Sequence, residues 1–168
     1  MLEAALLVLF PLLMAYAASS DLLTMTIPNR LALILVASFP VMAWAVGMDP
    51  AAMLMNLAAA GIVLALTFSF FAFGWMGGGD AKLAGASALW LGFGVLLDYL
   101  LLAAVAGGVL TVALLAIRRY PLPAFALGWP WLARLHHPKT GIPYGIALAA
   151  AALAVYPYSA IWTAALAA

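Results

Sequence analysis

The sequence predicts an all-α membrane protein, a polytopic bundle of about six transmembrane helices with both termini outside. Three observations support this fold class. Of the 168 residues, 70% are apolar and 7% are charged, whereas a soluble domain is about half apolar and about a quarter charged. The apolar residues form runs close to the roughly 20 residues that cross a bilayer. The basic residues fall only in alternate connections between these runs.

Polar and turn-forming clusters divide the chain into six candidate spans. In order, they are Leu2–Ala18, Leu31–Val46, Ala51–Phe73, Ala81–Leu97, Leu100–Ile117 and Tyr144–Leu166. Most breaks contain Gly or Pro, which commonly end helices. The break near Asp98 is the least marked, because residues 81–117 are almost continuously apolar. One helix of these 37 residues would be about 55 Å long, so two spans joined by a tight turn are expected.

Charge placement supports the count of six and sets the orientation. Asp49 and Asp98 lie in the second and fourth connections, and Glu3 lies near the amino terminus. The basic residues of the other connections are Arg30, Lys82, Arg118, Arg119, Arg134 and Lys139. In a six-span chain they share one side, which the positive-inside rule identifies as the cytoplasm. The formal net charge of only +1 argues against a nucleic-acid partner.

Composition also limits the chemistry. The chain contains no cysteine, which excludes disulfides, thiolate metal sites and cysteine nucleophiles. His136 and His137 are adjacent and lack the spacing of a metal-binding motif. They belong to the fifth connection, which also contains Trp129 and Trp131. This composition predicts a segment that lies at the level of the lipid headgroups. We therefore expect one membrane domain over residues 1–168, in contact with lipid and without metal or cofactor.

Two acids stand apart from the others. Asp21 follows the first span directly, and Asp80 precedes the fourth, so both belong on the cytoplasmic side at similar depth. Carboxylates near hydrocarbon are costly and usually serve a function. When two of them meet, one holds a proton while the other ionises, so that one activates water and the other donates a proton. The pair therefore suits peptide hydrolysis, although each acid alone also suits a local capping role.

Glycines precede the second acid directly. Gly77, Gly78 and Gly79 have no side chains, so another backbone is able to approach Asp80 closely. This arrangement suits a peptide held extended beside the acid, with Lys82 near the acid pair. The Thr24 hydroxyl either bonds the pair or satisfies nearby backbone, and Lys82 is equally suited to an interfacial anchor.

These motifs resemble the prepilin peptidase family of GxGD-type membrane aspartyl proteases. Gly77-Gly78-Gly79-Asp80 matches the G-x-G-D motif, and Ala81-Lys82-Leu83 continues it as in many members. Asp21, Thr24, Ile27, Pro28 and Asn29 are similar to the first-aspartate motif, D-x-x-T-x-x-I-P-N. The segment Ile142-Pro143-Tyr144-Gly145 is similar to the one that opens the last helix of the family. The matches follow the family's order over nearly the whole chain.

The resemblance implies an aspartic endopeptidase that removes the leader of type IV prepilins at the cytoplasmic face of the bacterial inner membrane. Asp21 and Asp80 would be the catalytic pair. Gly77–Gly79 would line the leader, and Pro143, Tyr144 and Gly145 would border the cleft. The absence of cysteine resembles the short form associated with Flp/Tad-type pili, which implies peptidase activity without methyltransferase activity.

Two other functions compete with this interpretation. A presenilin- or signal-peptide-peptidase-like intramembrane protease shares the G-x-G-D motif, but places its acids inside longer helices of a larger protein. A proton-coupled carrier or a non-enzymatic assembly subunit would also use paired acids, but a carrier is expected to hold them near mid-membrane between repeats. No internal repeat is evident in the sequence.

Overall fold

The computed structural model describes residues 2–123 and 128–167, with side chains from residue 7 onward. The Glu3 side chain therefore lies outside the described residues. The described chain is helical in every regular element, which confirms the all-α class. The helices are α1 (Leu2–Thr24), α2 (Asn29–Ala45), α3 (Pro50–Ala72), α4 (Gly78–Leu91), α5 (Phe93–Ile117), α6 (Pro130–His136), α7 (Tyr144–Val155) and α8 (Ala160–Ala167).

Each of the six predicted spans corresponds to helix, but not each is long enough to cross a membrane. In the described residues, three helices pass by length and apolarity, namely Leu7–Thr24, Pro50–Ala72 and Phe93–Ile117. A fourth passes if α7 and α8, bent by 45° at the turn between them, count as one span. These three or four apolar helices are those of a multi-pass membrane protein. The count of six spans and the outer position of the termini stay predictions.

The helix α4 lies at the centre of the bundle. It packs against α2, α3, α5 and α7, and every residue from Leu83 to Leu91 is buried. Its small residues, Gly85 among them, allow neighbouring backbones to approach closely. Because protein rather than lipid surrounds it, this 14-residue helix need not match the thickness of a bilayer.

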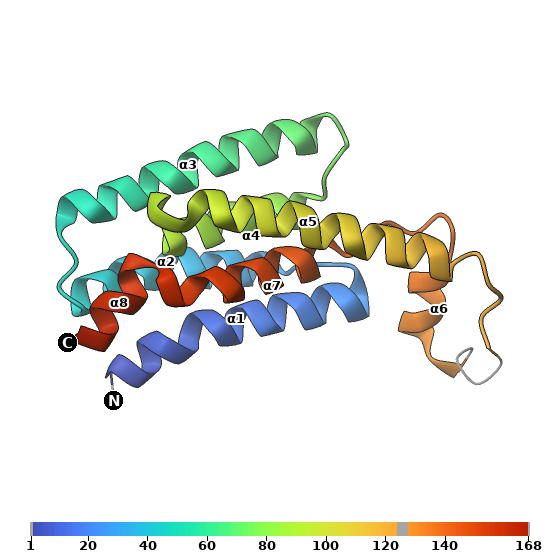
Figure 1. The fold of residues 1–168 in the computed structure, drawn as a ribbon, viewed down its shortest axis with the longest axis horizontal. Coiled ribbons are helices and arrows are strands. Elements are labelled where there is room, and N and C mark those ends of the chain that lie inside the picture. Colours follow the sequence, from blue (N-terminus) through green and yellow to red (C-terminus); the bar gives the residue numbers. More distant parts are fainter. Residues whose placement is uncertain (1, 124–127, 168) are drawn as a thin grey trace.

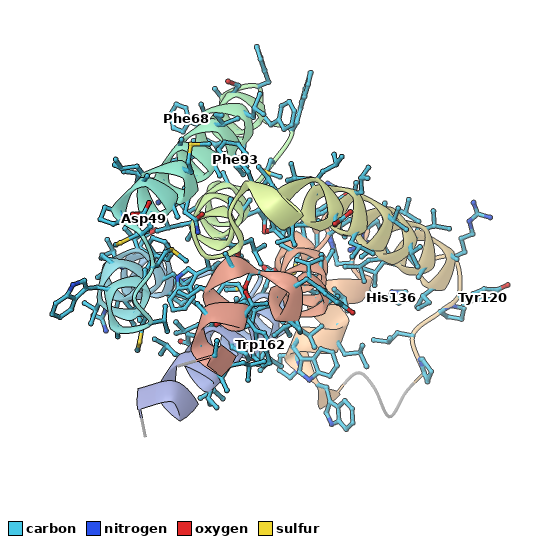
Figure 2. All side chains as sticks on the ribbon, turned by 60° about the vertical axis from the view of Figure 1, so that its left-hand side comes forward. Asp49, Phe68, Phe93, Tyr120, His136 and Trp162 are labelled. Atoms are coloured by element: carbon cyan, nitrogen blue, oxygen red, sulfur yellow. The ribbon has the colours of Figure 1, made fainter. Side chains whose placement is uncertain are left out.

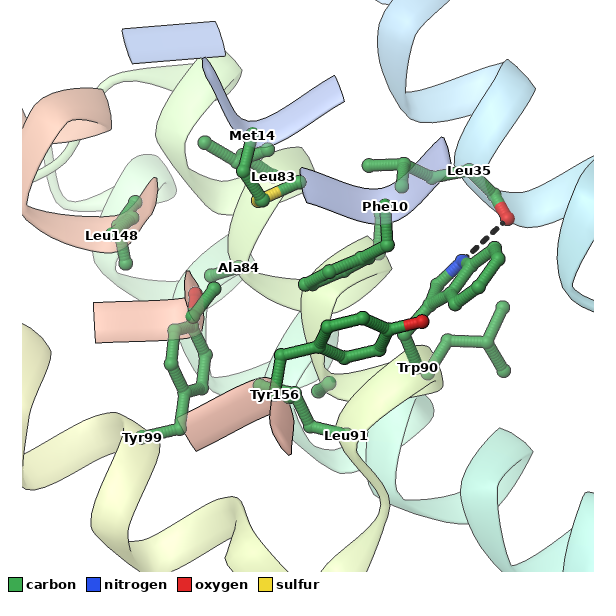
Figure 3. Packing of buried hydrophobic residues seen from close by; sticks show 14 of the residues in the cluster. Phe10, Met14, Leu35, Leu83, Ala84, Trp90, Leu91, Tyr99, Leu148 and Tyr156 are labelled. Atoms are coloured by element: carbon green, nitrogen blue, oxygen red, sulfur yellow. Dashed lines mark hydrogen bonds between the residues drawn. The ribbon is translucent and has the colours of Figure 1, made fainter. Parts of the chain in front are cut away.

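An aromatic cluster fills the core beside α4. Phe10 of α1 packs against Trp90 and Tyr156, with ring centroids 5.4 and 4.5 Å away. The Trp90 Nε1–H donates a hydrogen bond of 2.9 Å to the Leu35 carbonyl of α2 (Figure 3). The cluster thus joins α1, α2, α4 and the short 3₁₀ turn η2 (Tyr156–Tyr158) between α7 and α8.

The break between α4 and α5 lies six residues earlier than predicted. The chain turns at Gly92, with φ of 66°, and Asp98 lies inside α5. Glycine adopts this backbone without the strain that a side chain would bring. Asn56 of α3 donates to the Leu89 carbonyl at 3.0 Å and so satisfies a carbonyl at the end of α4. The predicted boundary near Asp98 was therefore wrong.

Local signals explain the neighbouring turn between α2 and α3. The Asp49 side chain accepts a hydrogen bond from the Ala51 N–H at 3.1 Å, and Pro50 occupies the first turn of α3. This pairing of an acidic N-cap with proline is typical of a helix start.

The two ends of the bundle differ. The start of α1 and the end of α8 lie at one end, and α6 lies at the other (Figure 1). The connections from α1 to α2, from α3 to α4 and from α5 to α7 lie at the same end as α6. Figure 2 shows Asp49 and the pair Tyr120 and His136 on opposite sides of the molecule. We call the end with α6 the basic end, because the connections and first turns there carry the Lys and Arg residues.

Candidate active site

Asp21 lies in the last turn of α1, not after it. The helix continues beyond the predicted end at Ala18 as far as Thr24. This extension brings Asp21 into the bundle, where its side chain is 5% exposed. Its Oδ2 accepts a hydrogen bond of 2.7 Å from the backbone N–H of Gly145, at the start of α7. A Cβ on Gly145 would lie 2.8 Å from that same oxygen, so glycine permits the contact.

Hydroxyl groups hold the turn that follows α1. The Ser20 hydroxyl donates to the Thr26 carbonyl at 2.8 Å, and the Thr24 hydroxyl donates to the Ser20 carbonyl at 2.7 Å. Met25 adopts a left-handed backbone with φ of 56°, which reverses the chain direction. Thr24 therefore satisfies local backbone, the second of its two predicted roles, and fixes the loop beside Asp21.

Asp80 lies in the first turn of α4. Gly77 is the N-cap of this helix, with extended backbone at φ −69° and ψ 142°. The Asp80 carboxylate reaches back to the Gly77 N–H, as the third residue of a capping box does. A Cβ on Gly77 would lie 2.8 Å from Asp80 Oδ2, and one on Gly79 would lie 3.2 Å from Ile27 Cβ. These glycines thus allow the carboxylate and the loop after α1 to close on the start of α4.

The two acids line one pocket of about 240 Å³ at the basic end. Its lining comes from two segments distant in sequence, the end of α1 with the turn after it and the start of α4. The lining residues are Asp21, Met25, Thr26, Ile27, Gly77, Gly78, Gly79 and Asp80. The sequence prediction that Asp21 and Asp80 come together at one end of the bundle thus agrees with this geometry.

The environment of Asp80 favours its protonated form. Burial, together with the nearby charge of Asp21, raises the pKa of the Asp80 carboxyl to about 7, against a smaller opposing effect of the Gly77 N–H. Burial and a like charge both penalise a carboxylate. Asp80 therefore keeps its proton in a substantial fraction of molecules near neutral pH, as a proton donor in hydrolysis requires.

The remaining predicted site residues lie around this pocket rather than in it. The Lys82 ammonium donates to Asn29 Oδ1 at 2.8 Å, across from α4 to α2. The Tyr144 hydroxyl lies 3.1 Å from the Thr111 hydroxyl of α5. Pro143 is buried just before α7, where it helps to present the Gly145 N–H. Lys82 is two residues after Asp80 in the sequence but is not among the residues that line the pocket with the two acids.

Sequence reasoning missed two contributors to the pocket. Ile27 packs against both Gly79 and Gly145, since a Cβ on Gly145 would lie 2.7 Å from Ile27 Cδ1. Its place in the D-x-x-T-x-x-I-P-N pattern was a signal for such a role. Met25 lines the pocket through its left-handed turn, and no feature of the sequence indicates this.

The positive charge of the protein gathers around the pocket. All six Lys and Arg residues lie in elements or connections at the basic end: Arg30, Lys82, Arg118, Arg119, Arg134 and Lys139. Arg134 of α6 donates to the Leu23 carbonyl at 3.0 Å, which ties α6 to the end of α1 just beyond Asp21. The pocket therefore lies at the same end of the bundle as the basic residues.

Comparison with known proteins identifies the family. The model of the type IV leader peptidase family matches residues 8–112, more than half of the chain, including both acids and the Gly77–Gly79 segment. This is a family of aspartic-type prepilin peptidases. The searches of curated proteins and of solved structures find no significant match. On the strength of the family match, the chain belongs to the type IV leader peptidase family and is an aspartic-type endopeptidase.

Proposed function

We propose that this protein removes the leader of Flp/Tad-type prepilins at the cytoplasmic face of the bacterial inner membrane, with Asp21 and Asp80 as its catalytic pair. One observation carries the proposal. Two carboxylates from α1 and α4 line the same small pocket at the basic end of an apolar bundle. A prepilin presents a basic leader followed by an apolar helix, so its cleavage site reaches such a pocket while the helix stays within the membrane.

The two acids take different roles in the proposed hydrolysis. Asp21 is the proposed base, and its Oδ2 accepts a hydrogen bond from the Gly145 N–H. It takes a proton from water as the water oxygen attacks the carbonyl carbon of the scissile peptide. Asp80, whose pKa is raised to about 7, donates its proton to the leaving nitrogen as the C–N bond breaks. Each hydrolysis thus moves one proton onto Asp21 and one off Asp80, and transfer of a proton from Asp21 to Asp80 restores the starting state of the pair.

The glycine segment is suited to hold the substrate. Gly77 has extended backbone and lies exposed at the mouth of the pocket. Side chains approach the two glycines that follow it, Phe71 beside Gly78 and Ile27 beside Gly79. An extended leader therefore meets the side-chain-free backbone of Gly77 beside Asp80.

Conservative substitution of the acids tests the proposal. We expect D21N and D80N each to abolish leader removal from a co-expressed Flp/Tad-type prepilin, because asparagine keeps the shape but neither accepts nor releases the proton. The matched control is D98N, since Asp98 is an exposed acid on α5 at the far end of the bundle. All three proteins should insert into membranes and elute as wild type in detergent. Normal processing by either D21N or D80N would contradict the mechanism.

A further inference from the structure

A long apolar groove runs over α4, between α2 and α3. It consists of two adjoining cavities of about 650 and 570 Å³. On α4 its floor is formed by Lys82, Gly85, Ala86 and Leu89, which follow the i, i+3, i+4, i+7 spacing of one helix face. The glycine and alanine keep this floor low. Along α4, the lining from Gly78 to Leu89 covers about 16 Å, or three helical turns.

The walls of the groove are formed by apolar side chains of α2 and α3. On α2, Leu33 and Val36 line it, and both side chains are about half exposed or more, at 67% and 49%. On α3, Leu57 and Leu64 line one cavity, and Phe68, which points outward from α3 in Figure 2, lines the other. Three helices thus present apolar faces to one groove that is about three helical turns long.

The groove is continuous with the pocket that holds the acids. Gly61, Leu64 and Lys82 line both of its cavities. Gly78 lines the second cavity and also the pocket with Asp21 and Asp80. A chain lying in the groove therefore reaches the acids at its end without crossing a helix.

Polar groups occur at only one end of the described lining. Asn29 and Lys82 bond each other at 2.8 Å, at the end of the groove near Gly78. The other lining residues are apolar or glycine. A fitting occupant is therefore apolar along about three turns and becomes polar where it reaches the acid pocket.

We propose that this groove binds the apolar helix of the substrate, the segment that directly follows the scissile bond. The inference rests on the proposed function, because that function supplies a substrate with a polar leader ahead of an apolar helix. Continuity with the acid pocket sets the direction, with the amino-terminal end of the substrate helix beside Gly78. The leader then leaves the groove at the position where Asp21 and Asp80 attack the bond.

Disulfide cross-linking tests the position of the substrate helix. Because this chain contains no cysteine, an introduced cysteine is the only one in the enzyme that is able to form the cross-link. In a D80N background, a single cysteine replaces Leu57 of the groove. The matched control is I62C on the same helix, because Ile62 is similarly exposed, 51% against 58% for Leu57, but faces away from the groove. The partner is a prepilin with one cysteine in its apolar segment, in the same vesicles. We expect L57C to cross-link several-fold more than I62C, and equal or absent cross-linking would show that lipid alone fills the groove.

Filling the groove tests its role in cleavage. A Cβ on Gly61 meets no atom within 4 Å, and the same holds for Gly108 on α5, so both positions accept a larger side chain without clash in the bundle. We expect G61L to lower kcat/KM for the full prepilin by about tenfold or more relative to G108L, as overpacking of an interface does. Equal rates for the two variants would overturn the proposal that the groove binds the substrate helix but would leave the proposed function intact. Failure of the wild type to cleave the prepilin would overturn both.

Discussion

The backbone N–H of Gly145 donates a hydrogen bond of 2.7 Å to Asp21 Oδ2 across 124 positions of sequence. The contact joins the start of α7 to the last turn of α1, and so brings a third segment to the acid pair. It also gives the I-P-Y-G segment a physical role, because the oxygen lies only 2.8 Å from the place that a Cβ on residue 145 would take. The donor stabilises the charge that the proposed base must carry.

Replacing Gly145 by alanine tests this contact. A Cβ there would lie 2.8 Å from Asp21 Oδ2 and 2.7 Å from Ile27 Cδ1, so either the carboxylate or the turn after α1 must move. We expect G145A to lower kcat/KM for prepilin by at least about tenfold, since such overpacking costs on the order of 1–3 kcal/mol. The control is G141A, whose Cβ would lie no nearer than 4.0 Å to Met25 Cε. Equal activity of the two variants would show that the contact is dispensable.

The raised pKa of Asp80 predicts a pH profile. The pKa of about 7 lies above the ordinary value, so the proton is present below pH 7 and lost above it. Because the proposed donor needs that proton, kcat/KM should fall about tenfold per pH unit above neutrality. Returning the protein from pH 8.5 to pH 6.5 should restore the rate, which separates titration from unfolding. A rate that still rises through pH 8 would exclude Asp80 as the proton donor.

The predicted orientation has its own test. If the basic end faces the cytoplasm, reporter fusions after Gly47 and after Asp98 should report the outside, and one at Lys139 should report the cytoplasm. The reason is the positive-inside rule, with all six basic residues at one end. A cytoplasmic signal at Gly47 would reverse the orientation of the bundle. It would also move the acid pocket to the outer face, away from a cytoplasmic leader.

The acid pair was predictable because its determinants are local. Apolar runs and the alternation of charge place Asp21 and Asp80 at the same end, and the Gly77–Gly79 segment marks a close approach. The Gly47–Pro50 turn was predictable for the same reason, since Asp49 caps the helix that it precedes.

The features that sequence reasoning missed depend on tertiary contacts. The turn at Gly92 is selected by Asn56 of α3, which bonds the end of α4, so Asp98, six residues later, was a misleading signal. Lys82 finds its partner, Asn29, 53 positions away. The continuation of α1 to Asp21 places that acid inside a helix, because the bundle buries it there. None of these three features can be predicted from the residues adjacent in sequence.

The attachment of α6 gives a final prediction, based on two adjacent arginines. Arg118 donates from Nε to the Leu135 carbonyl and from Nη2 to the Gly141 carbonyl, both at 2.9 Å. It therefore clamps the end of α6 and the approach to α7 onto α5, whereas no such bond is described for Arg119. We expect R118A to speed proteolytic cutting within residues 118–143 several-fold, because charge-assisted hydrogen bonds to backbone hold a segment with few buried contacts.

The matched variant R119A removes the same charge one residue later and should be cut at the wild-type rate. Since the clamped segment leads directly into the Gly145 donor, R118A should also lower cleavage of prepilin, and R119A should not. Equal protease sensitivity of the two variants would show that charge at the basic end, rather than the two carbonyl contacts of Arg118, holds α6 in place.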